Sequence, residues 1–452
     1  MNRWNLAWLL GIPMVVVMGL TLSYSAPIGR EHEQDYELIH LIGDVLTEVD
    51  HNYVRELSAD ERRRLVEDMI NGGLERLDPH STYFSEREFR QFEGKTKGKF
   101  GGIGVQISLD RSAGALMVTS PIVGTPAYDA GMMSGDLIIK INGQSMEHKR
   151  TTEAVELIQG DPGETVTLTV LHEGDPKPVE MTLTRAEIEV PTVLGNHRKT
   201  DNPSEWDYFV DRENKIAHIR VLEFHETTAG ELKTVIQGLE AAGVKGVVLD
   251  LRGNPGGLLP SAVEIADFFL TEGTIVSTRE RNTKEDKPFV AKAAGGLLEP
   301  AKDHPMVVLV DRFSASASEI VSAALQDHQR AVVAGERSFG KGSVQKLIRL
   351  GDRKSAIKLT TASYWRPSGK NIHRFPDSKE TDEWGVKPNE GFEVSLTDED
   401  RKAYYTGRRA RDILPSKTGI MPDKLREKVE APFTDKVMDK AVEYLRDQVK
   451  KS

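Results

Sequence analysis

Two short runs that are apolar apart from one aspartate each constrain the fold of this chain most strongly. Residues 246–251 and 306–311 offer almost no polar position that could face water. Runs of this kind predict strands buried on both faces, as in parallel sheets covered by helices. Helical patterns at 229–242, 261–270 and 316–326 alternate with these runs and with strands predicted at 215–221 and 331–334. The alternation over residues 190–389 predicts an α/β core.

At 452 residues the chain has room for two or three domains. A helical pattern covers 35–92, with a capping-box signature from Ser58 to Glu61 and a turn at 77–81. Short alternating strands with glycine turns fill 100–185, and charged helical sequence runs from 397 to the end. The predicted parts are a signal peptide or membrane anchor at 1–26, an N-terminal helical region at 30–96, a β-rich domain at 97–186, an α/β core at 190–392 and a C-terminal helical extension at 397–452.

The first 26 residues predict where the protein works. Asn2 and Arg3 precede an apolar run at 6–22, and small residues follow at 23–26. This order is typical of a secretory signal, and roughly 17 apolar residues also approach the length of a bilayer-spanning helix. We expect a cleaved signal or, in preference, a retained anchor. Either one predicts that the rest of the chain lies outside the cytoplasm, in a periplasm or cell envelope.

Composition excludes several kinds of chemistry. The chain has no cysteine, so disulfides, thiolate metal sites, cysteine catalysis and a lipidated cysteine are ruled out. The net charge of −10 is spread along the chain and argues against nucleic-acid binding. Its 12 histidines show no zinc-binding spacing, and no GxSxG motif is present. We expect neither a metal nor another cofactor.

The segment Phe313-Ser-Ala-Ser-Ala-Ser-Glu319 and Lys341, which stands between two glycines, suggest nucleophilic chemistry. A serine hydroxyl beside a neutral lysine is a workable nucleophile and base. The lysine pKa must then fall by roughly three units from about 10.4, at a cost of about 4 kcal/mol. A plainer reading makes Ser316 a helix cap paired with Glu319, and Lys341 a solvated loop residue. The residues alone do not separate Ser316 from Ser314 or Ser318.

Three further features surround this pair. The turn Asn254-Pro255-Gly256-Gly257 follows a predicted buried strand and could offer backbone N–H groups to a substrate, although it also suits an ordinary turn. Gln345 lies four residues after Lys341, where it could orient the lysine without adding charge or could simply be a surface residue. The loop at 101–105 could hold a chain-terminal carboxylate or act as a tight turn.

Several segments in a shared order resemble the C-terminal processing peptidases, also called tail-specific proteases. The segments are Phe100-Gly-Gly-Ile-Gly-Val105, Ser120-Pro121 through Pro126-Ala127, Gly135-Asp-Leu-Ile138, Ile141-Asn-Gly143, Asp250-Leu-Arg-Gly-Asn-Pro-Gly-Gly257, Ser314–Glu319, Phe339-Gly-Lys-Gly-Ser-Val-Gln345 and Tyr364-Trp-Arg-Pro-Ser-Gly369, with Leu77-Asp-Pro-His-Ser81 before them. The likeness covers residues 35 to 392.

The resemblance implies an α/β multidomain protein with a PDZ domain inserted before a crotonase-related protease core. It assigns the nucleophile to Ser316, the general base to Lys341 and a lysine-orienting role to Gln345. It implies oxyanion donors at Ala317 and at Gly256 or Gly257, and peptide binding at Gly102, Ile103, Gly104 and Val105. Many family members carry arginine where Gln159 stands here.

We therefore predict an extracytoplasmic, membrane-tethered serine endopeptidase that cuts proteins near their free C-termini. Two alternatives are a non-catalytic PDZ scaffold that binds C-termini and an acyl-CoA enzyme. The expected partners are protein or peptide substrates, not nucleic acid. The sequence leaves open an adaptor or activator protein, homo-oligomer formation and a regulatory role of the PDZ domain.

Overall fold

The computed structural model describes residues 30–451 apart from 111–114, 148, 173, 282–285, 293–296, 299–302 and 415–432. The signal or anchor expected at 1–26 lies outside the described residues. Across the described ranges, every helix is too short or too polar to cross a bilayer. The chain forms two compact units, which divide between Arg76 and Leu77.

From residue 30 onward, the first unit contains the helices α2 (Arg30–Asn52) and α3 (Ala59–Glu75). The capping box expected at the start of α3 is confirmed. Ser58 accepts a hydrogen bond from the Glu61 N–H, and the Glu61 carboxylate accepts one from the Ser58 N–H at 2.9 Å. These contacts satisfy N–H groups that the first helical turn leaves unpaired.

The β-rich domain is built on an antiparallel sheet in the order β3-β4-β5-β7-β8, with β6 paired to β5. Its elements are β3 (Val105–Asp110), β4 (Ala115–Pro121), α5 (Pro126–Asp129), β5 (Leu137–Ile141), β6 (Gln144–Ser145), α6 (Thr151–Ile158), β7 (Thr165–Leu171) and β8 (Val179–Thr184). Ile103, Leu116, Ile138 and Leu168 are fully buried in one core. A ribbon of β2 (Lys99–Gly102) and β9 (Ala186–Glu189) joins the two ends of this domain.

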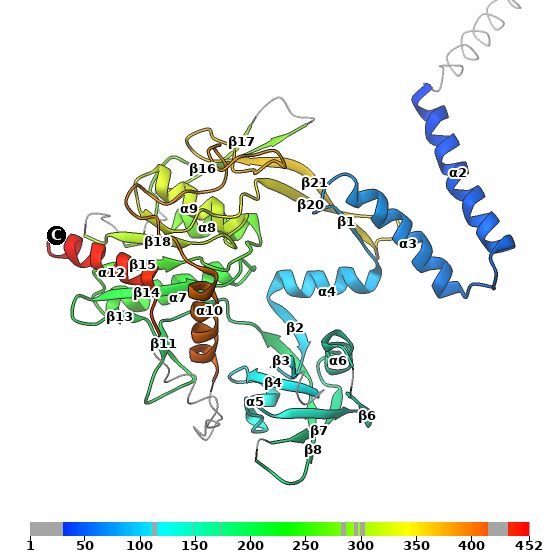
Figure 1. The fold of residues 1–452 in the computed structure, drawn as a ribbon, viewed down its shortest axis with the longest axis horizontal. Helices are drawn as coiled ribbons and strands as arrows, with labels where there is room; N and C mark the ends of the chain where they lie inside the picture. The colour runs from blue at the N-terminus through cyan, green and yellow to red at the C-terminus, as the bar shows by residue number, and fades with distance from the viewer. Residues whose placement is uncertain are drawn as a thin grey trace, which may run out of the picture. The chain divides into compact units, whose positions relative to one another are not determined.

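The α/β core has parallel strands in the order β14-β15-β18-β19, with β10 and β13 antiparallel on β14 (Figure 1). Its strands are β10 (Val193–Leu194), β13 (Phe209–Asp211), β14 (Ile216–Val221), β15 (Gly246–Asp250), β18 (Met306–Val310) and β19 (Val332–Gly335), and a small ribbon is formed by β11 (His197–Arg198) and β12 (Trp206–Asp207). All residues of β15 and β18 are buried, as their apolar runs predicted.

Helices cover both faces of this sheet. Apolar residues of α7 (Thr228–Ala241), α8 (Leu259–Asp267) and α9 (Ala317–Asp327) share one core with Ile219, Leu249 and Val308. The C-terminal helix α12 (Lys436–Val449) packs its apolar residues on Val248, Val307 and Leu309, which point to the opposite face. Alternate residues of one strand therefore pack into two different hydrophobic cores, one on each face of the sheet.

A second, antiparallel sheet was not predicted. It follows the order β1-β21-β16-β17, with β20 on β21, and comprises β1 (Thr82–Phe84), β16 (Thr274–Glu280), β17 (Lys287–Val290), β20 (Ser343–Arg349) and β21 (Ala356–Trp365). Polar and apolar residues mix in β20 and β21, which are mostly half-buried, so they lack the signal of a core strand. Strand β1 lies where a helical pattern was expected, and α4 (Glu86–Lys97) follows it. The helix α10 (Asp398–Asp412) completes the described elements.

Candidate active site

Three neighbouring parallel strands deliver the candidate residues to one edge of the core sheet. Strands β15, β18 and β19 lie side by side, so the loops after Asp250, Val310 and Gly335 emerge together. These loops carry the glycine turn, Ser316 and Lys341, respectively. Hydrogen bonds join them: the Ala315 N–H donates to Asn254 O at 3.0 Å, and the Phe339 N–H donates to Ser314 O at 3.0 Å. The carboxyl edge of such a sheet is the usual place for a ligand site.

Ser316 begins helix α9 with unusual backbone angles. Its φ of 54° and ψ of −111° lie in a region that residues with a side chain rarely adopt. Strain of this kind persists only where surrounding contacts impose it, and it gathers at functional sites. Ser316 is 8% exposed, while Ser314 and Ser318 are fully buried.

The three serines are now distinguishable. The Ser314 hydroxyl donates to Leu251 O at 2.8 Å, and the Ser318 hydroxyl donates to Asn254 O at 3.0 Å. Both hydroxyls hold the glycine-turn loop in place. Ser316 instead meets the phenol of Tyr364 on β21, and burial raises the pKa of that phenol to about 12. Packing thus separates Ser316 from its neighbours independently of any resemblance.

The glycine turn lies directly against Ser316. A Cβ on Gly256 would come within 2.8 Å of Ser316 Cβ and 3.0 Å of the Ala317 nitrogen, so only glycine fits there. The Gly256 N–H donates to Asn254 Oδ1 at 2.8 Å. In the part of the chain that the structure describes, the N–H groups of Gly257 and Ala317 have no partner. The expected oxyanion donors thus differ, since the Gly256 N–H is already paired within its turn; the oxyanion role of any of them stays a prediction.

Lys341 is half-buried in a loop whose glycines are required by packing. A Cβ on Gly342 would lie 2.3 Å from the His373 nitrogen, and one on Gly340 would lie 2.7 Å from Arg374 Cβ. The pKa of Lys341 is lowered, first by burial and then by the charge of Lys358. Glu319 and Asp78 oppose this shift. The direction is the one a general base near neutral pH needs.

Gln345 lies on β20, and its amide group contacts residues of β20 and β21. Its amide nitrogen donates to Ser343 Oγ at 3.0 Å and to Thr360 Oγ1 at 3.1 Å. Thr360 in turn donates to Asp78 Oδ1 at 3.0 Å, so Gln345 is tied to the turn at 77–81. The orienting contact between Gln345 and Lys341 stays a prediction.

Glu319 was read from sequence only as the partner of a helix cap. Its fully buried carboxylate accepts four hydrogen bonds, from the N–H groups of Ser316, Gly340 and Lys341 and from the Ser338 hydroxyl. Burial raises the pKa of Glu319 to about 6, against the effect of these four donors. The Ser-x-x-Glu spacing was the signal in the sequence for the contact with Ser316. The other partners of Glu319, from Ser338 to Lys341, lie 19 to 22 residues further along the chain, where that spacing gives no signal.

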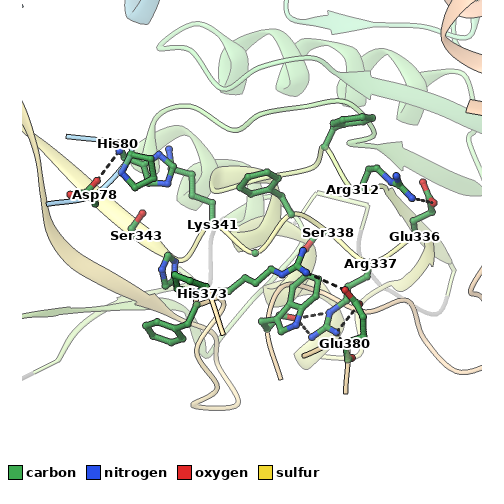
Figure 2. A pocket seen from close by; sticks show the side chains of 18 of the residues that line it. Asp78, His80, Arg312, Glu336, Arg337, Ser338, Lys341, Ser343, His373 and Glu380 are labelled. Atoms are coloured by element: carbon green, nitrogen blue, oxygen red, sulfur yellow. Dashed lines mark hydrogen bonds and ion pairs between the residues drawn. The ribbon is translucent and has the colours of Figure 1, made fainter. Parts of the chain in front are cut away.

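A cleft of about 1100 Å³ opens beside Lys341. Figure 2 shows the Lys341 side chain extending toward His80 and Asp78, with His373 and Ser343 nearby. Burial and the Lys341 charge lower the pKa of His80. The cleft is also lined by Phe313, Phe339 and Phe375, each about half exposed. It therefore combines partly exposed apolar rings with the amine of Lys341, as a peptide-binding cleft would.

A second, smaller cavity of about 330 Å³ lies between β3 and α6. Its lining is largely apolar and consists of Phe100, Ile103, Gly104, Val105, Gln106, Ile107, Thr151, Val155, Ile158 and Gln159. Three of the four residues expected to bind peptide, Ile103, Gly104 and Val105, line it, and Gly102 lies just before them. Gly104 has a φ of 77°, and a Cβ there would lie 2.3 Å from Thr125.

Comparison with known proteins identifies the families to which parts of the chain are similar. Residues 215–390 match the model of peptidase family S41, and residues 117–171 match that of a PDZ domain. The carboxy-terminal-processing protease of Bartonella bacilliformis is 34% identical over 454 residues, which cover 96% of this chain and 95% of that protein. The carboxy-terminal processing protease CtpB of Bacillus subtilis is 34% identical over 344 residues, which cover 76% of this chain and 65% of CtpB.

Among solved structures, a photosystem II D1 C-terminal processing protease is 25% identical, with a TM-score of 0.41 and coverage of 77% of this chain and 86% of that one. The likeness to the Bartonella protein extends over nearly the whole of both chains, beyond the stretch that each family model matches. This chain therefore belongs to the carboxy-terminal processing proteases of peptidase family S41, and is a serine protease with a PDZ domain.

Proposed function

We propose that this enzyme is a Ser-Lys endopeptidase that cuts proteins near their C-termini after its PDZ domain has bound the free tail. The observation that supports this most is the environment of Ser316. Alone among the three serines, it keeps its hydroxyl away from loop carbonyls, and the unpaired Ala317 and Gly257 N–H groups lie on its two neighbouring segments.

In the proposed first step, Lys341 Nζ takes the proton of Ser316 Oγ as that oxygen attacks the scissile carbonyl carbon. The carbonyl oxygen becomes an oxyanion and accepts hydrogen bonds from Ala317 and Gly257 N–H. Collapse of this intermediate breaks the C–N bond, and the protonated lysine gives its proton to the leaving amine. Water then attacks the acyl-serine, with Lys341 again as base, and Ser316 regains its proton.

The lysine side chain must turn for this chemistry. Among the hydrogen bonds of the described residues, none joins Lys341 Nζ to Ser316 Oγ, and the side chain extends toward His80 (Figure 2). Catalytic hydrogen bonds often tighten only when substrate is bound. A peptide lying in the cleft beside Phe339 would exclude water from the lysine and favour its neutral form.

The apolar groove of the PDZ domain is proposed to bind the tail. An extended peptide would pair with β3, and its terminal carboxylate would meet the N–H groups of 102–105. We also propose that the enzyme acts outside the cytoplasm, held at the membrane by residues 1–26. The N-terminal pattern of Asn2, Arg3 and the apolar run at 6–22 supports this location.

Substitution of the two reacting residues tests the proposal. Ser316→Ala and Lys341→Ala are each expected to lower kcat/KM for a peptide with a free apolar C-terminus by about 10³-fold or more, because each removes a group that acts in the transition state. Ser368→Ala, which changes an exposed serine, is the control. Unchanged cleavage by Lys341→Ala would exclude the mechanism.

Peptide cleavage, peptide binding and CoA-thioester binding together separate the alternatives. A PDZ scaffold without activity would bind the peptide and leave it intact in the unmodified protein. An acyl-CoA enzyme would bind a CoA thioester tightly, which we do not expect here. Trapping of substrates on Ser316→Ala, followed by mass spectrometry of their C-termini, would identify the sequences that are cut.

A further inference from the structure

Glu319 occupies a position that a helix cap alone does not explain. Ser58 with Glu61 and Ser85 with Glu88 form boxes of the same spacing at the starts of α3 and α4. Those two carboxylates bond the N-cap serine of their own helix and lie in exposed surroundings. The Glu319 carboxylate is fully buried, as few carboxylates are without a compensating set of donors.

The two oxygens of Glu319 bind both halves of the candidate site. Oε2 accepts the N–H of Ser316 and the N–H of Lys341, each at 2.8 Å. Oε1 accepts the Gly340 N–H and the Ser338 hydroxyl, each at 2.6 Å. One carboxylate thus connects the start of the nucleophile helix to the loop of the base.

A third segment is joined through Ser338. The Ser338 hydroxyl, which donates to Glu319, accepts the Val386 N–H at 2.7 Å. A Cβ on Gly385 would lie 2.9 Å from the same hydroxyl, so this contact leaves no free space. The loop from Ser338 to Lys341 is therefore held from two sides.

We infer that Glu319 is a positioning residue that holds the Ser316 backbone and the Lys341 loop in a fixed relation, beyond its role as a helix cap. The inference rests on the proposed Ser-Lys chemistry. Four donors to one buried carboxylate fix both backbones, and charge-assisted bonds of this kind are roughly twice as strong as neutral ones. Such a tether lets Ser316 keep its strained φ while Lys341 Nζ remains free to move.

The charge of Glu319 has an additional effect that a purely structural residue would lack. The negative carboxylate opposes the loss of positive charge from Lys341 and so raises the pKa of that lysine. The other charged groups that act on Lys341 are Lys358 and Asp78. Removal of the Glu319 charge should consequently make Lys341 easier to deprotonate, even while the geometry of the site worsens.

The test is Glu319→Gln, compared with the matched capping-box variant Glu88→Gln. We expect kcat to fall by about tenfold or more at unchanged KM, because misalignment of reacting groups affects the transition state and not the binding of the tail. The acid limb of the kcat/KM profile should also move to lower pH. Glu319→Asp, which keeps the charge, should return that limb toward its original position.

Two results would overturn the inference. One is a Glu319→Gln enzyme whose kcat loss matches that of Glu88→Gln; the other is an acid limb that does not move. If Glu319→Gln fails to fold, Ser338→Ala tests the same tether, with an expected loss in kcat at unchanged KM and pH profile. Normal kcat in Ser338→Ala would then count against the inference. Failure of the proposed function is distinguishable, because Ser316→Ala and Lys341→Ala would then retain activity.

Discussion

The charge state of Lys341 depends on the side chains that surround it. Burial and the nearby charge of Lys358 lower its pKa, while Glu319 and Asp78 raise it. In the proposed role of base it would act only when neutral, so kcat/KM should rise with pH and level off above the pKa of Lys341. Because that pKa is lowered, kcat/KM should increase at a pH below about 10.4, which is the pKa of an ordinary lysine.

Lys358→Met tests this dependence directly. Removal of the neighbouring positive charge should raise the pKa of Lys341, so the acid limb of the kcat/KM profile should move to higher pH. Glu319→Gln should move it the opposite way. Lys346→Met, on the solvent-exposed side of the neighbouring strand, is the matched control. An acid limb that is identical in Lys358→Met and in the unmodified enzyme would contradict the electrostatic coupling.

For single residues, the sequence identified the kinds of side chain at the candidate site better than it identified their contacts. The pair of Ser316 and Lys341 stood out through its small neighbours. The residues alone left Ser314 and Ser318 open, the family resemblance selected Ser316, and the carbonyl partners of the other two serines add a reason from the structure. Tyr364 reaches Ser316, and the Ser338–Lys341 loop reaches Glu319, only through folding of segments that lie far along the chain, which no local pattern reveals. Gln345 was expected to orient Lys341, which stays a prediction; its amide nitrogen donates to Ser343 and Thr360.

Among the elements, the C-terminal helices support the loop that carries the glycine turn. Arg252, which precedes that turn, binds Asp250 within the core and Asp435 at the start of α12, with distances of 2.6 and 2.8 Å. The Arg252 guanidinium also lies 4.2 Å from the ring centre of Tyr404 on α10. Arg252 and Asp250 are each about 2% exposed at the side chain, so their charges depend on one another.

Arg252→Met is therefore expected to lower the free energy of unfolding by about 3–5 kcal/mol, because it leaves two carboxylates without their buried partner. Urea denaturation followed by the near-ultraviolet signal of the core measures this change. Lys199→Met removes an exposed ion pair with Glu205 and should cost less than about 1 kcal/mol. Equal losses of unfolding free energy in the two variants would show that the buried ion pairs of Arg252 stabilise the protein no more than an exposed pair does.

The helices and parallel strands of the core were predictable because their signals are local. Apolar runs marked β15 and β18, and period-3.6 patterns marked α7 and α9. The second sheet was missed because β20 and β21 are half-buried strands whose stability comes from pairing with each other. Strand β1 adds only three residues and depends on β21 for its partners.

In the whole molecule, the proposed tail recognition and the proposed cleavage lie at separate sites, the groove between β3 and α6 and the region of Ser316 and Lys341. Val155→Arg would place a charge in the apolar groove between β3 and α6. It should raise KM for a long peptide with a free C-terminus and leave kcat for a short peptide that spans only the cut site unchanged. Val179→Arg, at an exposed position on β8 of the same domain, is the control. An unchanged KM in Val155→Arg would argue against capture of the tail by this groove.

The sequence by itself determined the α/β core, the β-rich domain before it and the candidate nucleophile and base, because hydrophobic periodicity and short motifs are local properties of a chain. Only the tertiary structure decided which serine hydroxyls bind loop carbonyls, which glycine N–H is already paired and how one buried glutamate joins the Ser316 and Lys341 segments. Those features depend on hydrogen bonds between segments tens of residues apart, such as Ser314 to Leu251 and Glu319 to Lys341. The order of parallel strands brings these segments to one edge of the sheet, and burial there sets the charges on which the chemistry depends.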